Sequence, residues 1–508
     1  MPLAPVKYVQ VAIVCIAILI APAAQAQSTT GSGSGLPNLG DSASITPSTE
    51  RRLGNRIARE LYRDPDYIDD PVIMEYVQGI WQPLLAAARL RGELPPELDE
   101  QYAWTILLGK DRTVNAFALP GAYLGLHLGL VGIVTSRDEL AAVLAHELSH
   151  VTQRHIARLI SRQSEQTPWL IGAMILGALA ASKNPGAANA VLVGGQAAAI
   201  QTQLNFSRDM EREADRVGFG VASQAGFAPQ GFVSMFEKLQ QSSRLNDSGG
   251  FPYLRSHPLT TERMADMQVR VPASAAATPP PQWEHALIAA RARVLSNSAV
   301  DALRNWYLEA EPARLARQNP MQQAGTLYGA TLAAIKLRDF ALADASLGRL
   351  TSAVKNDAKA ARQVRLLAAE LALAKGDGAK AQTALGTQMQ VGSRAELLLL
   401  AQAQLHTGQA AQAGQLLQTW LADNPLDALA WQTLASVSAA QGKTLAAIRA
   451  EAEVNIAQLD YPAALARLKA AQDLARNATL GADHFEASIV DTRTRQVEQL
   501  LREQALER

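Results

Sequence analysis

The sequence is poor in several residue types, and each scarcity excludes a class of protein. One cysteine occurs in 508 residues, Cys15, and it lies in an apolar segment near the N-terminus. If the chain is cleaved after that segment, the mature protein has no disulfide, no thiolate metal ligand and no cysteine nucleophile. Lysine plus arginine equal aspartate plus glutamate at 47 each, so no surface for nucleic acid is indicated. After the N-terminal segment no run reaches about 18 apolar residues, which argues against an intramembrane enzyme.

The first 26 residues are typical of a cleavable signal peptide. Lys7 precedes an unbroken apolar run over residues 11–20, and Ala24-Gln25-Ala26 fits a small-x-small cleavage site. An uncleaved membrane anchor is the alternative, although this apolar run is short for a bilayer span. The pattern therefore predicts an exported protein.

The next part of the chain combines helices with a few strands. Residues 27–47 are rich in Gly, Ser, Thr and Pro, which predicts a flexible linker. Apolar periodicity and turn residues predict helices over 48–63, 71–91, 136–163 and 207–224, and strands over 102–108, 114–120 and 122–126. A capping box from Ser136 to Glu139 begins the helix at 136. The apolar stretch 169–181 is either a buried helix or a hairpin facing a membrane or partner, with 187–201 as its return helix.

A change of composition follows the Pro/Ala linker expected at 273–282. Residues 283–508 are rich in Ala, Leu and Gln, and Gly376, Gly408 and Gly442 recur at spacings of 32 and 34. This period resembles tetratricopeptide repeats, which stack helix pairs into a solenoid with a concave surface for partner proteins. An alanine-rich helical bundle is the alternative. The expected fold class is mainly α, with an α+β domain holding a small β-sheet over 48–272 and an all-α tetratricopeptide-like solenoid over 283–508.

The segment His146-Glu147-Leu148-Ser149-His150 carries the strongest chemical signal. Histidines at i and i+4 of a helix lie about 40° apart on one face, so both imidazoles can reach one Zn²⁺. The glutamate beside the first histidine can then deprotonate a water at the metal. We therefore predict His146 and His150 as metal ligands and Glu147 as the general base.

A third ligand has to come from elsewhere in the sequence. An extended metzincin motif needs a glycine and a third histidine where this chain has Gln153 and Ile156. His155 falls on the opposite side of the helix and is expected to be a surface or outer-sphere residue rather than a ligand. A glutamate from a later helix is the alternative, and Glu211 and Glu213 are the candidates.

The two motifs together resemble the gluzincin metallopeptidases that include HtpX and the CAAX prenyl proteases. That family combines His-Glu-x-x-His with a downstream Glu-x-x-Ala-Asp, and this chain has Glu211-Arg-Glu213-Ala-Asp215. The resemblance implies Glu211 as the third ligand to one Zn²⁺ per chain, with Glu213 as the runner-up. Asp215 lies at i+4 from Glu211, where it can accept the free N–H of a ligand histidine. A surface charge is the alternative for Asp215.

A closer resemblance is to the BepA-type periplasmic proteases. It rests on Val114-Asn-Ala-Phe-Ala118, Val151-Thr-Gln-Arg-His155 and Ser256-His-Pro258. The family implies a zinc metallopeptidase domain over 48–272 that is joined to the repeats. It also implies a periplasmic location and a role in outer-membrane protein assembly. Association with the outer membrane itself stays open. The segment 119–122 departs from this pattern and looks more like the single-domain relatives, which puts substrate preference in doubt.

Two further site assignments depend on this resemblance. Asn115, Ala116 and Phe117 are expected to pair with an extended substrate, since a protease must straighten a peptide to expose the bond. A plain sheet edge is the alternative. His257 corresponds to a family histidine that approaches the zinc from a loop. It can hold the enzyme latent, or donate to the oxyanion in the transition state; without the family it would be a surface loop histidine.

These features predict a periplasmic zinc metalloendopeptidase that degrades misfolded or stalled proteins and supports outer-membrane protein assembly. The repeats would dock it to the assembly machinery, and peripheral membrane contact stays open. The alternative function is a chaperone or adaptor for the same assembly process, in which the repeats dominate and proteolysis is secondary.

Overall fold

A computed structural model describes residues 45–162, 207–245, 252–272, 282–386, 393–477 and 483–505. The expected signal peptide at 1–26, nearly all of the linker at 27–47, the apolar stretch 169–181, its return helix 187–201 and most of the linker at 273–282 lie outside the described residues. The described part is mainly helical with one small sheet, which confirms the expected fold class.

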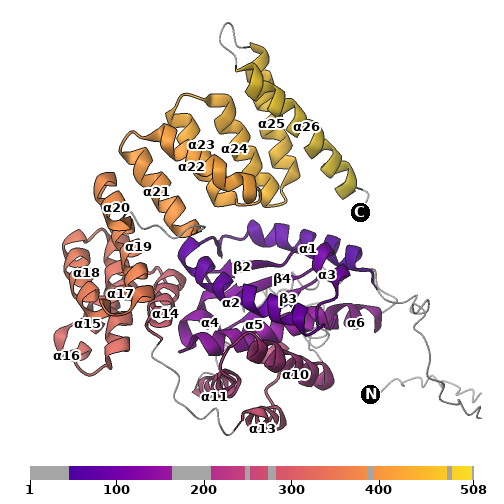
Figure 1. The fold of residues 1–508 in the computed structure, drawn as a ribbon, viewed down its shortest axis with the longest axis vertical. Helices are drawn as coiled ribbons and strands as arrows, with labels where there is room; N and C mark the ends of the chain where they lie inside the picture. Colours follow the sequence, from indigo (N-terminus) through magenta and orange to yellow (C-terminus); the bar gives the residue numbers. More distant parts are fainter. Residues whose placement is uncertain are drawn as a thin grey trace, which may run out of the picture. The chain divides into compact units, whose positions relative to one another are not determined.

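The sheet is mixed and has the strand order β1-β2-β4-β3 (Figure 1). β2 (Thr105–Gly109) runs parallel to β4 (Tyr123–His127), and β3 (Ala116–Leu119) pairs antiparallel with β4. These three strands confirm the predicted ones. β1 (Tyr67–Ile68), which pairs antiparallel with β2, was too short for its sequence pattern to indicate. β3 is an edge strand, and its position depends on Gly125, where a Cβ would lie 2.1 Å from the Phe117 ring.

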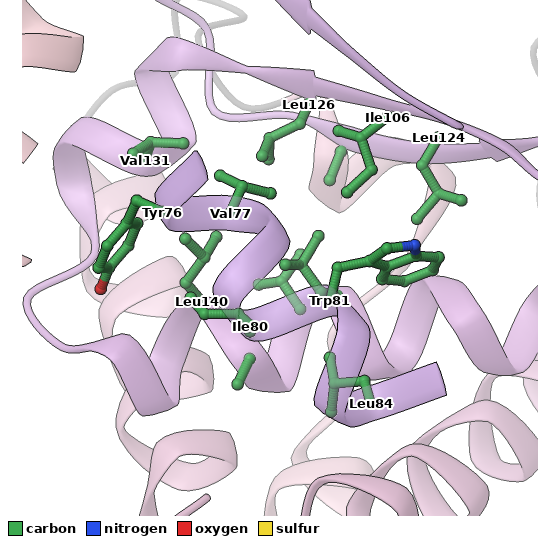
Figure 2. Close-up of a cluster of buried hydrophobic side chains, with 14 of the residues drawn as sticks. Tyr76, Val77, Ile80, Trp81, Leu84, Ile106, Leu124, Leu126, Val131 and Leu140 are labelled. Atoms are coloured by element: carbon green, nitrogen blue, oxygen red, sulfur yellow. The ribbon is translucent and has the colours of Figure 1, made fainter. Parts of the chain in front are cut away.

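The core of the N-terminal part forms between the sheet and α2 (Pro71–Leu90), whose N-cap Asp70 accepts from Ile73 N at 2.8 Å. Figure 2 shows Val77, Ile80 and Trp81 of α2 packed below apolar side chains of β2 and β4. Each such side chain stabilises the fold by about 1.5–3 kcal/mol when it leaves water. α1 (Pro47–Tyr62) was predicted, whereas the short helices α3 (Pro96–Gln101) and α4 (Leu128–Ile133) were not.

The helix of the zinc motif, α5 (Arg137–Thr152), begins where the sequence predicted but ends eleven residues early. Its N-cap Ser136 accepts from Glu139 N at 3.1 Å. The single helix predicted to residue 163 is wrong, because the chain breaks at Arg154 and resumes as α6 (His155–Arg162). Arg154 has φ of 51°, and its guanidinium donates to the buried Glu50 at 2.9 and 3.1 Å. An ion pair between α1 and the turn therefore stabilises the break.

The remaining helices of this part follow as α10 (Arg208–Gln224), α11 (Gln230–Leu245), α12 (Tyr253–Ser256) and α13 (Thr261–Arg270). α10 confirms the helix predicted over 207–224, and it packs across α5 (Figure 1). The close approach needs Gly218, because a Cβ there would lie 3.0 Å from the Ala145 backbone.

The C-terminal part of the described chain consists of helices that pack on one another in sequence order, as in a solenoid. The predicted turns at Gly376, Gly408 and Gly442 are present, each with φ between 71° and 80°. Tetratricopeptide character in the strict sense stays a prediction. No described helix is both long enough and apolar enough to cross a bilayer. The helices are α14 (Trp283–Ser296), α15 (Val300–Glu309), α16 (Pro312–Leu315), α17 (Pro320–Leu337), α18 (Phe340–Val354), α19 (Ala358–Ala374), α20 (Gly378–Leu385), α21 (Arg394–His406), α22 (Ala410–Asp423), α23 (Ala428–Ala440), α24 (Thr444–Ala457), α25 (Tyr461–Asn477) and α26 (His484–Ala505).

Buried and partly buried ion pairs tie the C-terminal helices to the N-terminal end of α2. Arg291 of α14 donates to Asp70 at 2.7 and 2.9 Å and lies 2.8 Å from Glu370 of α19. Arg394 of α21 lies 2.6 Å from Asp69, next to the same N-cap. The hydrophobic cluster of α2 also continues into α14, α19 and α21, so no solvent layer separates the two parts at this point.

Candidate metal centre

Four buried side chains bring one ligand atom each to a single point. His146 and His150 come from α5, Glu211 from α10 and His257 from the residue after α12, and their ligand atoms all lie within 4.8 Å of one another. Each of these residues is at most 1% exposed. Two of the three imidazoles are those predicted as ligands, and the carboxylate is Glu211, the choice that the family resemblance implied.

The spacing of these atoms fits a tetrahedral zinc ion. The Nε2 atoms of His146 and His150 lie 3.0 Å apart, and they lie 3.5 and 3.4 Å from the Glu211 carboxylate. Nδ1 of His257 lies 3.1 Å from Glu211 and 3.3 Å from His146 Nε2. Zn–N bonds of about 2.0–2.1 Å in a tetrahedron place ligand atoms about 3.3–3.4 Å apart. Three nitrogens and one carboxylate oxygen are also ligands that Zn²⁺ prefers.

Glu147 lies beside this group and is fully buried. Within the described residues neither of its carboxylate oxygens has a hydrogen-bond partner, and Oε1 lies 3.5 Å from His257 Nε2. A buried carboxylate without a donor is costly, so the position favours a residue that accepts from a bound water. Glu147 thus lies beside the ligand group, and its role as the general base stays a prediction.

Asp215 lies where the sequence predicted an outer-sphere acceptor. Its Oδ1 is 3.0 Å from Nδ1 of His146, the nitrogen that faces away from the ligand cluster. The carboxylate also accepts from Arg263 at 2.6 and 2.8 Å, and Arg263 Nη1 lies 2.8 Å from Glu211. Burial opposes ionisation of Asp215, but the hydrogen bonds from Arg263 and His146 outweigh burial and lower its pKa. Asp215 thus stays charged, and its role in orienting the His146 ring stays a prediction.

Glu211 also stays ionised in its buried position. Burial raises its pKa, but the imidazoles of His257 and His146 outweigh this effect and hold the pKa well below the usual range. An anionic oxygen among three imidazoles gives the site the charge that a divalent cation requires.

Sequence reasoning missed two residues of this site, Arg263 and Tyr253. Arg263 lies six positions after His257 on α13, and its role depends on partners about 50 residues away. Tyr253 stacks on His257 with ring centroids 4.7 Å apart, and burial raises its pKa well above the usual value. The aromatic residue four positions before His257 was the one available signal for this stacking.

The remaining candidates occupy different places. Glu213, the runner-up ligand, lies outside the metal-ligand group and accepts from His155 at 3.1 Å. Asn115 and Ala116 are buried where β3 begins, and Phe117 packs its ring over Gly125 of β4. β3 is thus a sheet edge in contact with α5, while substrate pairing along it stays a prediction.

Two helical histidines, a glutamate from a later helix and the neighbouring Glu147 carboxylate fit a zinc metallopeptidase site, with His257 at a fourth position. Residues 77–271 match the model of Peptidase family M48, so this part of the chain is similar to the zinc metallopeptidases of that family. The match begins within α2 and includes every residue of the ligand group.

Curated proteins with similar sequences agree with this assignment. The chain is 33% identical over 320 residues to a putative beta-barrel assembly-enhancing protease of Vibrio cholerae, a match that covers 62% of this chain and 63% of the relative, slightly less than two thirds. It is 29% identical over 464 residues to the beta-barrel assembly-enhancing protease of Escherichia coli, over 89% of this chain and 90% of the relative. The mitochondrial metalloendopeptidase OMA1 of Saccharomyces cerevisiae is 28% identical over 201 residues, or 39% of this chain and 55% of the relative.

Proposed function

We propose that the chain is a periplasmic zinc endopeptidase that cleaves misfolded or stalled proteins and thereby supports the assembly of outer-membrane β-barrel proteins. The buried cluster of His146, His150 and Glu211 beside the free carboxylate of Glu147 carries this proposal. The printed names of the Vibrio and Escherichia relatives support the link to β-barrel assembly. The export signal expected at 1–26 supports the location.

The residues of the site divide the catalytic work. Zinc, held by His146, His150 and Glu211, would polarise the scissile carbonyl and lower the pKa of the attacking water. Glu147 lies beside the ligand group, so its carboxylate would accept the water proton and then pass it to the leaving amine. Asp215 keeps the Nδ1 proton of His146 in place, which leaves Nε2 free for the metal.

An extended substrate would add a strand to the edge of the sheet at β3. The strand that carries Ala116 and Phe117 is bonded on one side to β4. β3 also contacts α5, the helix of the zinc motif. Main-chain pairing of this kind gives affinity without strict side-chain preference, which suits unfolded proteins of varied sequence.

His257 would hold the enzyme latent until a substrate or partner displaces it. Support comes from its Nδ1, which lies among the ligand atoms where the fourth ligand of a tetrahedral zinc belongs. A fourth protein ligand closes a catalytic zinc site to water. Proteolysis would then begin when the loop after α12 moves away.

A second candidate function is an adaptor in outer-membrane assembly, with proteolysis secondary. The favouring observation is that the similarity to the Escherichia protein covers 89% of this chain and so extends into the C-terminal helices. The C-terminal helices would dock the protein to the assembly machinery in either case.

The test compares the full chain with Glu147→Gln and His257→Ala, using His406→Ala on the exposed end of α21 as the control. Zinc content and casein cleavage are measured for each. Latency predicts that His257→Ala cleaves casein faster than the wild type; loss of cleavage with zinc retained would instead support an oxyanion role. Outer-membrane assembly that survives in Glu147→Gln cells would favour the adaptor function.

A further inference from the structure

The turn after α5 returns the chain to the metal centre. Because α5 ends at Thr152 and Arg154 adopts a left-handed conformation, α6 begins with His155 directed back toward His150. His155 is fully buried, and its ring centroid lies 4.9 Å from that of His150. This histidine was expected on the far side of a continuous helix, so the helix break is what gives it access to the metal ligand.

A chain of hydrogen bonds leads outward from His150 through this residue. Nδ1 of His155 lies 2.9 Å from Nδ1 of His150. Nε2 of His155 lies 3.1 Å from Glu213 Oε2, and the same carboxylate oxygen accepts from Arg158 at 2.7 Å. The chain therefore starts at a buried ligand and ends at an ion pair near the surface.

The protons of this chain follow from the chemistry of a metal-bound imidazole. When Nε2 of His150 binds the metal, its single ring proton resides on Nδ1. That N–H can donate across the 2.9 Å contact only if Nδ1 of His155 is unprotonated. The proton of neutral His155 then resides on Nε2, where it faces the Glu213 carboxylate. Glu213 thus selects the tautomer of His155 that can accept from His150.

We propose that His155 and Glu213 are positioning residues for the metal ligand His150. His155 orients the His150 ring by accepting its Nδ1–H, and Glu213 holds His155 in the accepting tautomer. The other ligand histidine, His146, has a carboxylate in direct contact at the equivalent nitrogen, Asp215 at 3.0 Å. His150 has an imidazole inserted between its N–H and the carboxylate. The proposal rests on the zinc centre of the proposed function.

The substitutions separate orientation of the ligand from simple packing. His155→Leu removes the acceptor and keeps an apolar side chain in the buried site. His155→Asn keeps an acceptor, because its amide oxygen reaches the position of Nδ1, while the link to Glu213 is lost. Glu213→Gln keeps the acceptor for His155 but removes the charge. Glu262→Gln is the control, since Glu262 forms a surface ion pair with Arg212 of α10 at 2.7 Å.

The experiment measures zinc affinity of the full chain by competition with a chromophoric chelator, together with the thermal unfolding of the zinc-free protein. Loss of an outer-sphere partner typically weakens metal binding by roughly 10–100-fold. We expect that loss for His155→Leu, a smaller loss for Glu213→Gln, and recovery of most of the affinity in His155→Asn. Zinc-free unfolding temperatures should stay close to that of the wild type for Glu213→Gln and His155→Asn.

Several results would overturn the proposal. One is a His155→Leu protein that is folded and binds zinc within about twofold of the wild type, far from the roughly tenfold minimum expected. Another is His155→Asn binding no better than His155→Leu, or Glu213→Gln behaving like Glu262→Gln. If His155→Leu does not fold, the zinc affinities of His155→Asn, Glu213→Gln and the control Glu262→Gln decide whether the proposal stands. Failure of the zinc centre itself is distinct, because the wild type would then bind no zinc at all.

Discussion

Removing Arg291 should destabilise the protein far more than removing a surface arginine. Arg291 is 5% exposed and contacts two acidic side chains, those of Asp70, the N-cap of α2, and Glu370 of α19. In Arg291→Met both carboxylates lose their buried counter-charge, which costs about 3–5 kcal/mol. The matched control is Arg314→Met, whose partner Glu309 lies 3.0 Å away with both side chains about half exposed. Exposed pairs of that kind contribute about 0–1 kcal/mol.

The assay is urea unfolding of the zinc-loaded full chain, with the free energy of unfolding compared between the two variants. Adding Glu370→Gln to Arg291→Met should recover part of the loss, because one of the two uncompensated carboxylates is then neutral. Asp70 is left unchanged in this series, since it also caps α2. For a buried pair we expect the free energy of unfolding to fall by about 3–5 kcal/mol. A fall in Arg291→Met that stays within about 1 kcal/mol of the fall in Arg314→Met would refute the reasoning.

Other predictions concern the centre itself. Asp215→Asn should weaken zinc binding by roughly 10–100-fold, because the His146 ring loses its anionic acceptor. Competition with a chelator measures this affinity, and an unchanged affinity would contradict the role assigned to Asp215. Gly218→Val should destabilise the fold by about 1–3 kcal/mol and lower zinc content, since its Cβ meets the α5 backbone. The check is urea unfolding with metal analysis, beside Gly348→Val, where a Cβ meets nothing within 4 Å.

Much of the fold and two of the four residues at the ligand cluster follow from local sequence. The start of α5 follows from Ser136, and helical geometry alone brings His146 and His150 together. α10 and the three longer strands also show clear local patterns. Glu211 followed from the resemblance of its motif, since spacing alone left Glu213 open.

The features that local patterns could not show depend on distant partners. The helix break at Arg154 depends on Glu50, which lies 104 positions earlier in the sequence. Because of that break His155 joins the centre rather than the surface. The bonds from Arg263 to Asp215 likewise join segments 48 positions apart, and no periodicity signals such a pair. Long-range ion pairs thus determine the details of the site that the motif only outlines.

The most direct test of the central claim measures zinc content and casein cleavage for wild type and Glu147→Gln. The account predicts one zinc per chain in both proteins and a loss of cleavage of about 10²–10⁴-fold in Glu147→Gln, since the ligands are intact and the general base is gone. A wild-type chain without zinc, or a Glu147→Gln chain that cleaves as fast as the wild type, would contradict it.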